Sequence, residues 1–287
     1  MMEELAENIF VETAYEGVNV GAIVTKGGII CVDAPSYPRD ARHWVTRLSQ
    51  LNSRPIKYII LTNAHGDRIL NTRWLDAPII AHDTAAEKLS NYDKRYPQNL
   101  LDSLGQRNPM AGKELVNGPV DRASVSFNKT ITVMADDYHI ILSHAPGPSS
   151  GNIWAYIPEA GVLFAGDSVI VNEPPLLAEI RCTEWLATLN DLMAQYDVQT
   201  LVPGRGRVST PEEAVPPLMD YLCYMEDHVR QIVLEGKRRE STTVLEETLF
   251  SRFPLNSLPH EWVQKQIRLG LERIYNEIKS TVEVSLV

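Results

Sequence analysis

The stretch IILTNAHGDRILNTRW, residues 59–74, joins a run of apolar residues to a loop rich in polar side chains. The run Ile56–Leu61 has the length and the β-branched residues of a buried strand. The loop after it, Thr62–Arg68, contains a histidine, an aspartate and an arginine close together. Ligands of α/β proteins usually lie at the carboxyl ends of strands, so this loop is a candidate functional site.

Three later loops have the same character. They are residues 143–151, Gly166–Ser168 and Pro203–Gly206, and each follows a predicted strand. Glycines beside the polar residues allow sharp turns and close backbone approach. We therefore expect these loops, although distant in sequence, to converge on one site.

The chain around these loops alternates between short strand patterns and helical patterns. This mixture predicts a layered α/β fold followed by a helical tail. The polar segment 90–122 is expected to be a long loop or a loose helical insert. The predicted strands are Val18–Thr25, Gly28–Asp33, Ile56–Leu61, Pro78–Ala81, Lys129–Met134, Tyr138–Ser143, Ile153–Ile157, Val162–Phe164 and Thr200–Val202, and the predicted helices are Arg39–Leu51, Ile69–Leu75, Thr183–Tyr196, one from Thr84 and others from Thr210 onward.

Composition limits the classes of function. The 287 residues suffice for one large domain, or for a domain with an appendage. A formal charge of -10 disfavours nucleic acid as a partner. The three cysteines form no CxxC pair, which argues against a thiolate zinc site. We see no secretory signal and no membrane-spanning run, so we expect a cytoplasmic protein.

Four landmarks, in order, resemble the metallo-β-lactamase superfamily: Ile59–Trp74, the turn Ala145–Gly147, the strand end Phe164–Asp167 and the turn Val202–Gly204. Within that superfamily, Pro55–Trp74 and Glu173–Val208 are most similar to the glyoxalase II and cyclase-like hydrolases. The resemblance covers about residues 8–210. It implies an α/β fold of the αββα sandwich type, a metallo-β-lactamase-like domain over residues 1–210, and a C-terminal helical extension over residues 211–287.

The resemblance also implies a set of metal ligands. The family's first loop reads His-x-His-x-Asp-His, and its later loops supply a histidine, an aspartate and a final histidine. By position this chain keeps His65, Asp67 and Asp167. The residues that replace histidines are Asn63, Arg68, Pro148 and Arg205. Two further positions, Asp33 and His144, resemble residues that orient such a site from behind the ligands.

These replacements weaken metal binding for physical reasons. A catalytic zinc site needs about three protein ligands, and the resemblance leaves each of two ions with only two. A guanidinium stays protonated and cannot coordinate a metal. At ~5 Å and an effective dielectric near 20 it would repel a divalent ion by roughly 7 kcal/mol. We therefore expect no cofactor, the alternative being one weakly bound zinc, manganese or iron ion at His65, Asp67 and Asp167.

The same charges suggest a metal-free arrangement. Arg68 and Arg205 would fill the position of the second ion and form ion pairs with Asp67 and Asp167. A simpler role remains open for Asp67, which could cap a helix beginning near Ile69. His144 is expected to have a core or hydrogen-bonding role.

Three functions follow from the sequence. The first is a hydrolase homologue that has largely lost its dinuclear metal site and has a binding or structural role, with an unidentified small molecule or protein as partner. The second is a metal-dependent hydrolase of thioesters, lactones or similar esters, with a single ion and Asp67 as its catalytic residue. The third is a small-anion-binding module that uses Arg68 and Arg205.

The helical tail carries an apolar stripe that must be buried. We expect the stripe to pack on the protein's own core, with a homodimer through the C-terminal helices as the alternative. The stripe consists of Val263, Ile267, Leu271, Ile274 and Ile278.

Overall fold

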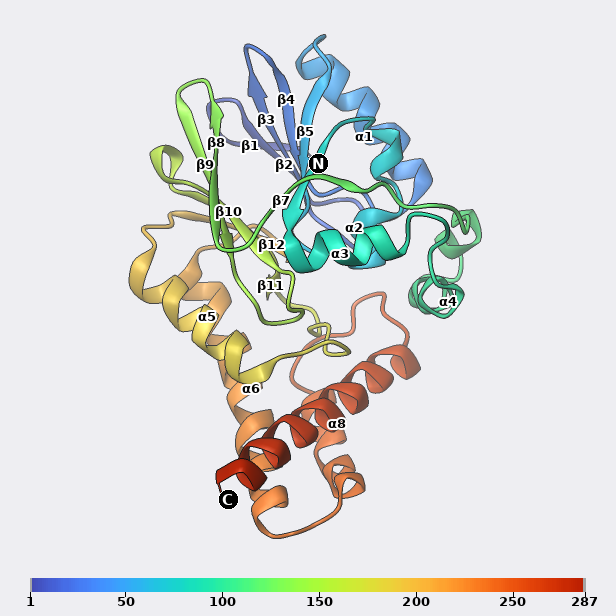
Figure 1. The fold of residues 1–287 in the computed structure, drawn as a ribbon, viewed down its shortest axis with the longest axis vertical. Coiled ribbons are helices and arrows are strands. Elements are labelled where there is room, and N and C mark those ends of the chain that lie inside the picture. The colour runs from blue at the N-terminus through green and yellow to red at the C-terminus, as the bar shows by residue number, and fades with distance from the viewer. Residues whose placement is uncertain (1, 286–287) are drawn as a thin grey trace.

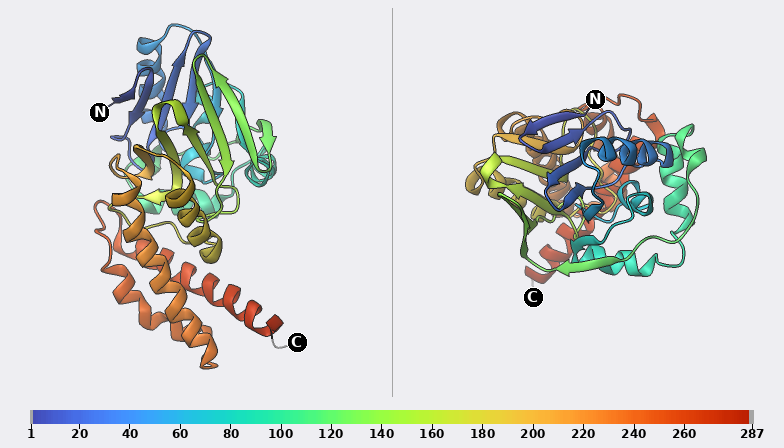
Figure 2. Two further views of the ribbon diagram at one scale, coloured as in Figure 1. Left: turned by 90° about the vertical axis from the view of Figure 1, so that its left-hand side faces the viewer. Right: turned by 90° about the horizontal axis from the view of Figure 1, so that it is seen from above.

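A computed structural model describes residues 2–285 and contains two β-sheets that pack face to face (Figures 1 and 2). The first sheet has seven strands in the order β1-β2-β3-β4-β5-β6-β7, and the second has five in the order β12-β11-β10-β9-β8. The strands are β1 Glu3–Ala6, β2 Ile9–Glu12, β3 Val20–Thr25, β4 Gly28–Val32, β5 Ile56–Ile60, β6 Ile79–His82, β7 Ala123–Phe127, β8 Thr130–Ala135, β9 Tyr138–His144, β10 Ile153–Ile157, β11 Val162–Ile170 and β12 Thr200–Arg205.

Helices cover the outer faces of both sheets, which confirms the predicted αββα sandwich (Figure 1). On β4, Ile30 and Val32 face the core between the sheets, whereas Ile29 and Cys31 face the helices outside. This alternation follows from the two-residue repeat of a strand, and it explains why β4 is apolar at every position. The helices are α1 Pro38–Leu51, α2 Gly66–Ile69, α3 Asp83–Asn91, α4 Gln98–Arg107, α5 Cys182–Gln195, α6 Pro211–Leu234, α7 Glu246–Phe250 and α8 His260–Ser285, with short 3-10 turns η1 Thr72–Trp74, η2 Ala111–Glu114, η3 Pro158–Ala160 and η4 Arg239–Leu245.

Parallel strand pairs determine where the polar loops meet. Strand β4 pairs in parallel with β5, and β5 with β6. In the second sheet β11 pairs in parallel with β12. Asp33 and the loop from Thr62 follow the carboxyl ends of β4 and β5, Asp167 lies in the second half of β11, and Arg205 ends β12. Their contacts show that the predicted convergence of the loops occurs at this edge of the sandwich.

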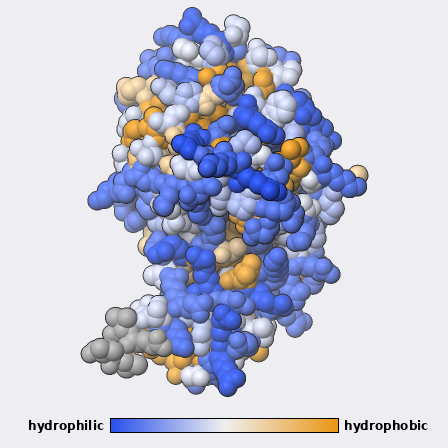
Figure 3. All heavy atoms as spheres, turned by 45° about the vertical axis from the view of Figure 1, so that its right-hand side comes forward, coloured by the Kyte–Doolittle hydropathy of each residue, from blue (hydrophilic) through white to orange (hydrophobic). Residues whose placement is uncertain are grey.

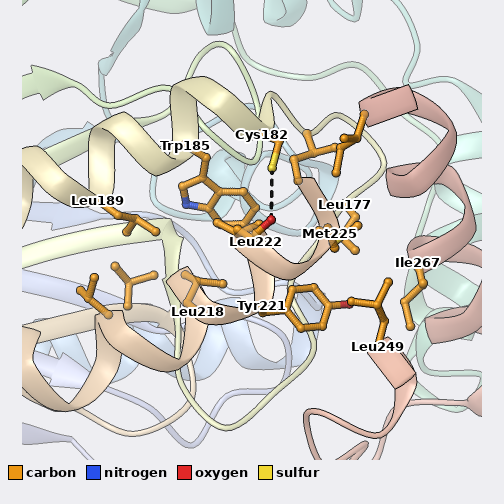
Figure 4. Packing of buried hydrophobic residues seen from close by; sticks show 14 of the residues in the cluster. Leu177, Cys182, Trp185, Leu189, Leu218, Tyr221, Leu222, Met225, Leu249 and Ile267 are labelled. Carbon is orange, nitrogen blue, oxygen red and sulfur yellow. Dashed lines mark hydrogen bonds between the residues drawn. The ribbon is translucent and has the colours of Figure 1, made fainter. Parts of the chain in front are cut away.

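The C-terminal helices extend below the sandwich and pack against α5 (Figures 1 and 2). Figure 4 shows Trp185 and Leu189 of α5 against Leu218 and Leu222 of α6. In the same view the Cys182 thiol lies 3.8 Å from the Leu222 carbonyl oxygen. All five residues of the predicted apolar stripe on α8 are buried in this core, as expected. The boundary at residue 210 and the homodimer stay predictions.

One predicted helix differs from the structure. The expected helix Ile69–Leu75 is broken into α2 and η1, because the Asn71 side chain donates to the Ser36 carbonyl and the Thr72 hydroxyl contacts Asp121. The segment 90–122 contains the helix α4 and the turn η2, so of the two alternatives it fits the helical insert.

The helix starts in the tail were also only partly predicted. Helix α6 begins at Pro211, as its Thr-Pro-Glu-Glu motif predicts, although the Thr210 side chain makes no capping bond. The pattern Thr243–Glu246 also resembles a helix-capping box, but no helix starts at Thr243, because η4 runs through it and the Thr243 hydroxyl donates to the Glu240 carbonyl. Among the described residues, no helix combines the length and apolarity needed to cross a bilayer.

Candidate functional site

Arg68 occupies the centre of the site and has no exposed side-chain surface. Its Nη1 donates to Asp33 Oδ2 at 2.7 Å, and its Nη2 donates to Asp167 Oδ1. Asp33 also accepts bonds from the backbone N–H and the hydroxyl of Thr62, at 2.8 and 2.7 Å. Asp33 was predicted to orient the ligand residues of the site. In the structure it orients the Arg68 guanidinium and the start of the loop at Thr62.

Two further arginines hold Asp67. Arg205 Nη2 donates to Asp67 Oδ2, and Arg107 Nη1 donates to the same oxygen at 3.1 Å. Arg205 Nε also lies 3.4 Å from Asp167 Oδ1. The side chains of Asp67, Arg107 and Arg205 are all at least nine-tenths buried. The predicted pairing of Asp67 and Asp167 with Arg68 and Arg205 is thus present. The alternative in which Asp67 caps a helix is wrong, because Asp67 lies inside the first turn of α2.

The network is electrically balanced. It joins three carboxylates to three guanidinium groups, and ion pairing is what makes such deep burial of charge tolerable. The pKa of Asp167 is lowered well below its ordinary value although burial opposes this, because Arg68, Arg205 and His65 all favour the carboxylate. The members of the network are Asp33, Asp67, Asp167, Arg68, Arg107 and Arg205.

Asn63 and His65 complete the surroundings of Asp167. The Asn63 amide donates to Asp167 Oδ2 at 2.9 Å, and His65 Nδ1 lies 3.0 Å from the same oxygen. The Asn63 side-chain oxygen accepts the backbone N–H of His65 at 2.8 Å, which fixes the loop. In the family pattern a histidine stands at residue 63, whereas here the amide serves as a hydrogen-bond donor to Asp167.

The two remaining predicted residues lie at the edge of the network. Pro148 lines a pocket together with His65 and Asp67. His144 Nε2 lies 2.9 Å from the Ser150 carbonyl oxygen, and its ring stacks on His82 at 3.9 Å between centroids. These contacts agree with the hydrogen-bonding role expected for His144.

Arg107 is the main residue that sequence reasoning missed. It ends α4, inside the segment 90–122 that was expected to be irregular, and belongs to no motif. Burial and the neighbouring positive charge of Arg205 lower the pKa of Arg107. Because the contact with Asp67 is tertiary, nothing within 90–122 could have indicated it.

A pocket opens beside Asp67, between α4 and α8. Its volume is about 120 Å³ and its walls are mainly apolar. Side chains from the α3–α4 region form one wall, and Trp262 from α8 lies on another side. Figure 3 shows a small group of hydrophobic side chains on the surface between the sandwich and the tail. The residues that line the pocket include Asp67, Tyr92, Tyr96, Leu100, Arg107 and Trp262.

The sequence of this chain matches a known protein family. Residues 15–205 match the sequence profile of the metallo-beta-lactamase superfamily. A curated relative, a metallo-beta-lactamase type 2 from Pseudomonas aeruginosa, is 24% identical over 208 residues, which are 70% of this chain and 75% of the relative.

Solved structures support the fold. A metallo-beta-lactamase from Pontibacter korlensis aligns with a TM-score of 0.63 at 14% identity, over 77% of this chain and 98% of that one. The stereoselective inverting sec-alkylsulfatase Pisa1 from Pseudomonas sp. aligns with a TM-score of 0.73 at 13% identity. That alignment covers 96% of this chain, so it includes most of the helical tail, and 50% of the sulfatase.

The expectation that no cofactor binds needs correction. The family matched here is typically zinc-dependent, and His65, Asp67 and Asp167 bring potential ligand atoms within 4.8 Å of one another. One nitrogen and two carboxylate oxygens suit a zinc ion. An ion bound there would compete with Arg107 and Arg205 for Asp67.

A second ion does not fit these residues. Asn63 and Pro148 replace two imidazoles, and the guanidinium groups of Arg68 and Arg205 cannot act as ligands. The chain thus keeps a group that could hold one metal ion. The profile match spans more than half of the sequence, and the landmark loops meet at one edge of an αββα sandwich. This chain belongs to the metallo-β-lactamase superfamily.

Proposed function

We propose that this protein does not carry out two-metal hydrolysis and that it uses its fold to bind a small molecule in the pocket beside Asp67. The observation that carries the proposal is Arg68, a fully buried cation whose donors are engaged by Asp33 and Asp167. Removal of a partner from a buried ion pair costs about 3–5 kcal/mol. A ligand or ion that displaced Arg68 would have to offset that cost.

The charge balance adds support. Three arginines already neutralise three aspartates, so a pair of divalent ions would leave the network strongly positive. The pocket adjoins this network, because Asp67 and Arg107 belong to both. The network would thus form one side of the binding site, and the ligand would contact the apolar side chains on the other sides.

The test is a metal titration with a restored variant. Native protein should bind fewer than two equivalents of zinc and show no chelator-sensitive hydrolysis of thioesters, lactones or β-lactams. The variant Asn63→His, Arg68→His, Pro148→His, Arg205→His should bind two equivalents if its fold, checked by circular dichroism, is retained. Two tightly bound ions with matching hydrolysis in the native protein would refute the proposal.

A second candidate function is a hydrolase with one metal ion, and the group His65, Asp67 and Asp167 favours it. These three residues would hold the ion, whose chemical contribution is to lower the pKa of a bound water. Near-stoichiometric zinc together with ester or thioester turnover, both lost in His65→Ala, would support this function. Metal retention without turnover would leave the binding role as the better explanation.

The anion-binding alternative has less support from the geometry. Arg68 is completely buried, and Arg205 is engaged by Asp67 and Asp167. An anion would have to compete with carboxylates that are already in place. A rise in melting temperature with phosphate, lost in Arg205→Ala, would revive this alternative.

A further inference from the structure

Two stacked histidines join the two sheets of the sandwich. His82 ends β6 of the first sheet, and His144 ends β9 of the second. Their ring centroids lie 3.9 Å apart and their planes differ by 10°. His82 is only 3% exposed. Among the described residues, the histidines in ion pairs are His65 and His139, so neither stacked ring has a carboxylate partner.

Hydrogen bonds hold His82 in its neutral form. The backbone N–H of Thr84 donates to His82 Nδ1 at 3.2 Å, so this nitrogen carries no proton. His82 Nε2 lies 2.8 Å from the Asn128 carbonyl oxygen, which only accepts, so Nε2 carries the ring proton. Through Nδ1, His82 is the N-cap of α3. Both ring nitrogens are therefore engaged in a way that only the neutral imidazole allows.

A proton on His82 Nδ1 would oppose the folded arrangement. The new N–H would face the N–H of Thr84, and the cap of α3 would be lost. The positive charge would also lie at the amino end of α3, where the helix dipole disfavours cations. Burial and the neighbouring His144 lower the pKa of His82, although the bond to Asn128 and the charge of Asp83 act in the opposite direction.

The elements around His82 supply little charge to compensate. On α3 the charged neighbour is Asp83, which is exposed. On β9 it is the titratable ring of His144. The turn between β7 and β8 contributes the uncharged Asn128 and the exposed Lys129, and the loop 145–151 has no charged residue. A protonated His82 would thus be a buried cation without a close counter-ion.

The stack lies where α3 packs on the loop 145–151. His144 Nε2 lies 2.9 Å from the carbonyl oxygen of Ser150 in this loop. A Cβ on Gly151 would lie 3.0 Å from the backbone nitrogen of Ala85, so the loop directly contacts the first turn of α3. Both segments therefore depend on the position of the two rings.

We propose that the His82–His144 stack is an acid-sensitive latch, which holds the first turn of α3 on the loop 145–151 and releases it when His82 takes up a proton. The opened form binds the proton with the ordinary pKa of 6.5, whereas the closed form has a lower pKa. The closed form is therefore fully favoured above pH 6.5 and loses stability as the pH falls through its own lower pKa. The latch does not depend on what the pocket beside Asp67 binds.

Native-state hydrogen exchange of the full-length protein tests the latch. Mass spectrometry follows peptides that cover residues 83–92, residues 145–151 and, as a reference, α6 at residues 211–234. Protection factors, corrected for the intrinsic exchange rate, are compared at about pH 7.5 and about pH 5.5. One proton changes the opening constant by at most about tenfold per pH unit, so we expect protection in the first two segments to fall at least about threefold at the lower pH. Protection of α6 should stay the same.

Two variants assign the response to His82. His82→Asn keeps a good capping residue that does not titrate, so protection should no longer depend on pH in this range. His139→Asn is the matched control, because His139 also lies on β9 but is 49% exposed and pairs with Glu159. This variant should keep the full pH response of the wild type.

A measurement on the wild type alone makes the test independent of whether a variant folds. An NMR titration of the His82 ring should give a midpoint below 6.5, the ordinary value. A midpoint at or above that value would overturn the proposal. So would equal protection at the two pH values, a response shared by α6, a response that His82→Asn retains, or one that His139→Asn removes.

Discussion

Arg68 and Asp167 form an ion pair in which neither side chain has exposed surface. Arg68 lies in α2, which follows β5 of the first sheet, and Asp167 lies in β11 of the second, so the pair joins the two sheets of the sandwich. Asp33, at the end of β4, holds the other side of the same guanidinium. These contacts link the end of β4, α2 and β11, so they contribute to the stability of the protein as well as to the charge balance of the site.

Replacement of Arg68 by methionine should strongly destabilise the protein. The change leaves Asp33 and Asp167 buried with fewer partners, at a cost of about 3–5 kcal/mol in the free energy of unfolding. Urea denaturation measures this change. The matched control is Arg181→Ala, which breaks a roughly half-exposed pair with Glu184 and should cost at most about 1 kcal/mol. Equal losses in the two variants would show that burial does not govern the Arg68 pair.

Stability should decline in acid because of Asp167. The pKa of this carboxyl is lowered in the folded protein, so the unfolded chain binds the proton more readily. The stabilisation is fully present above the ordinary pKa of 3.8 and is lost as the pH falls toward the lower pKa of the folded state. Denaturation of wild type and Asp167→Asn at several pH values from 6 down to about 2.5 measures the effect. The Asn variant should show a smaller decline in the free energy of unfolding; parallel curves would contradict the assignment.

Gly204→Ala should disrupt the network from the backbone side. A Cβ at residue 204 would lie 2.6 Å from Asp167 Oδ1 and 2.7 Å from Arg68 Nη2, so one of the paired groups must move. We expect a loss of about 1–3 kcal/mol in the free energy of unfolding, as for overpacked cores. Gly105→Ala in α4 is the control, because nothing lies within 4 Å of its added Cβ and alanine favours a helix by about 0.5–1 kcal/mol. Unchanged stability of Gly204→Ala would mean that the space beside Arg68 is larger than described.

Arg107→Gln should raise the affinity for a single zinc ion. The substitution removes one of the two cations on Asp67 and leaves Arg205 in place. A unit charge ~6 Å from a divalent ion is repelled by roughly 5 kcal/mol at an effective dielectric near 20, so even partial relief predicts at least about a tenfold lower dissociation constant. Competition with a zinc-binding dye measures it. Lys113→Gln, at an exposed position of η2 outside the network, is the control. Unaltered zinc affinity in Arg107→Gln would show that Arg107 does not oppose metal binding.

The sequence patterns by themselves determined a layered α/β fold with a helical tail and the composition of the central loops, and the resemblance to the superfamily implied the αββα sandwich. Apolar strands such as Ile56–Ile60, each ending in a polar loop, are local patterns, and parallel pairing brings their ends together in any protein with this strand order. The pairing of Arg68 and Arg205 with Asp67 and Asp167 was predicted from the positions that these residues take in the family's ligand pattern, and the structure contains it. Helix starts were less predictable where side chains such as Asn71 form tertiary contacts instead of local caps.

Only the tertiary structure decided that Arg107 joins the network, that Asp33 shares Arg68, and that Trp262 from the distant α8 lines the pocket beside Asp67. The physical reason is that these contacts join residues that lie far apart in the sequence and are related by no motif and no periodic pattern. Their free energy depends on burial and on the exact set of partners, which exist only when the sheets, α4 and the helical tail have packed together.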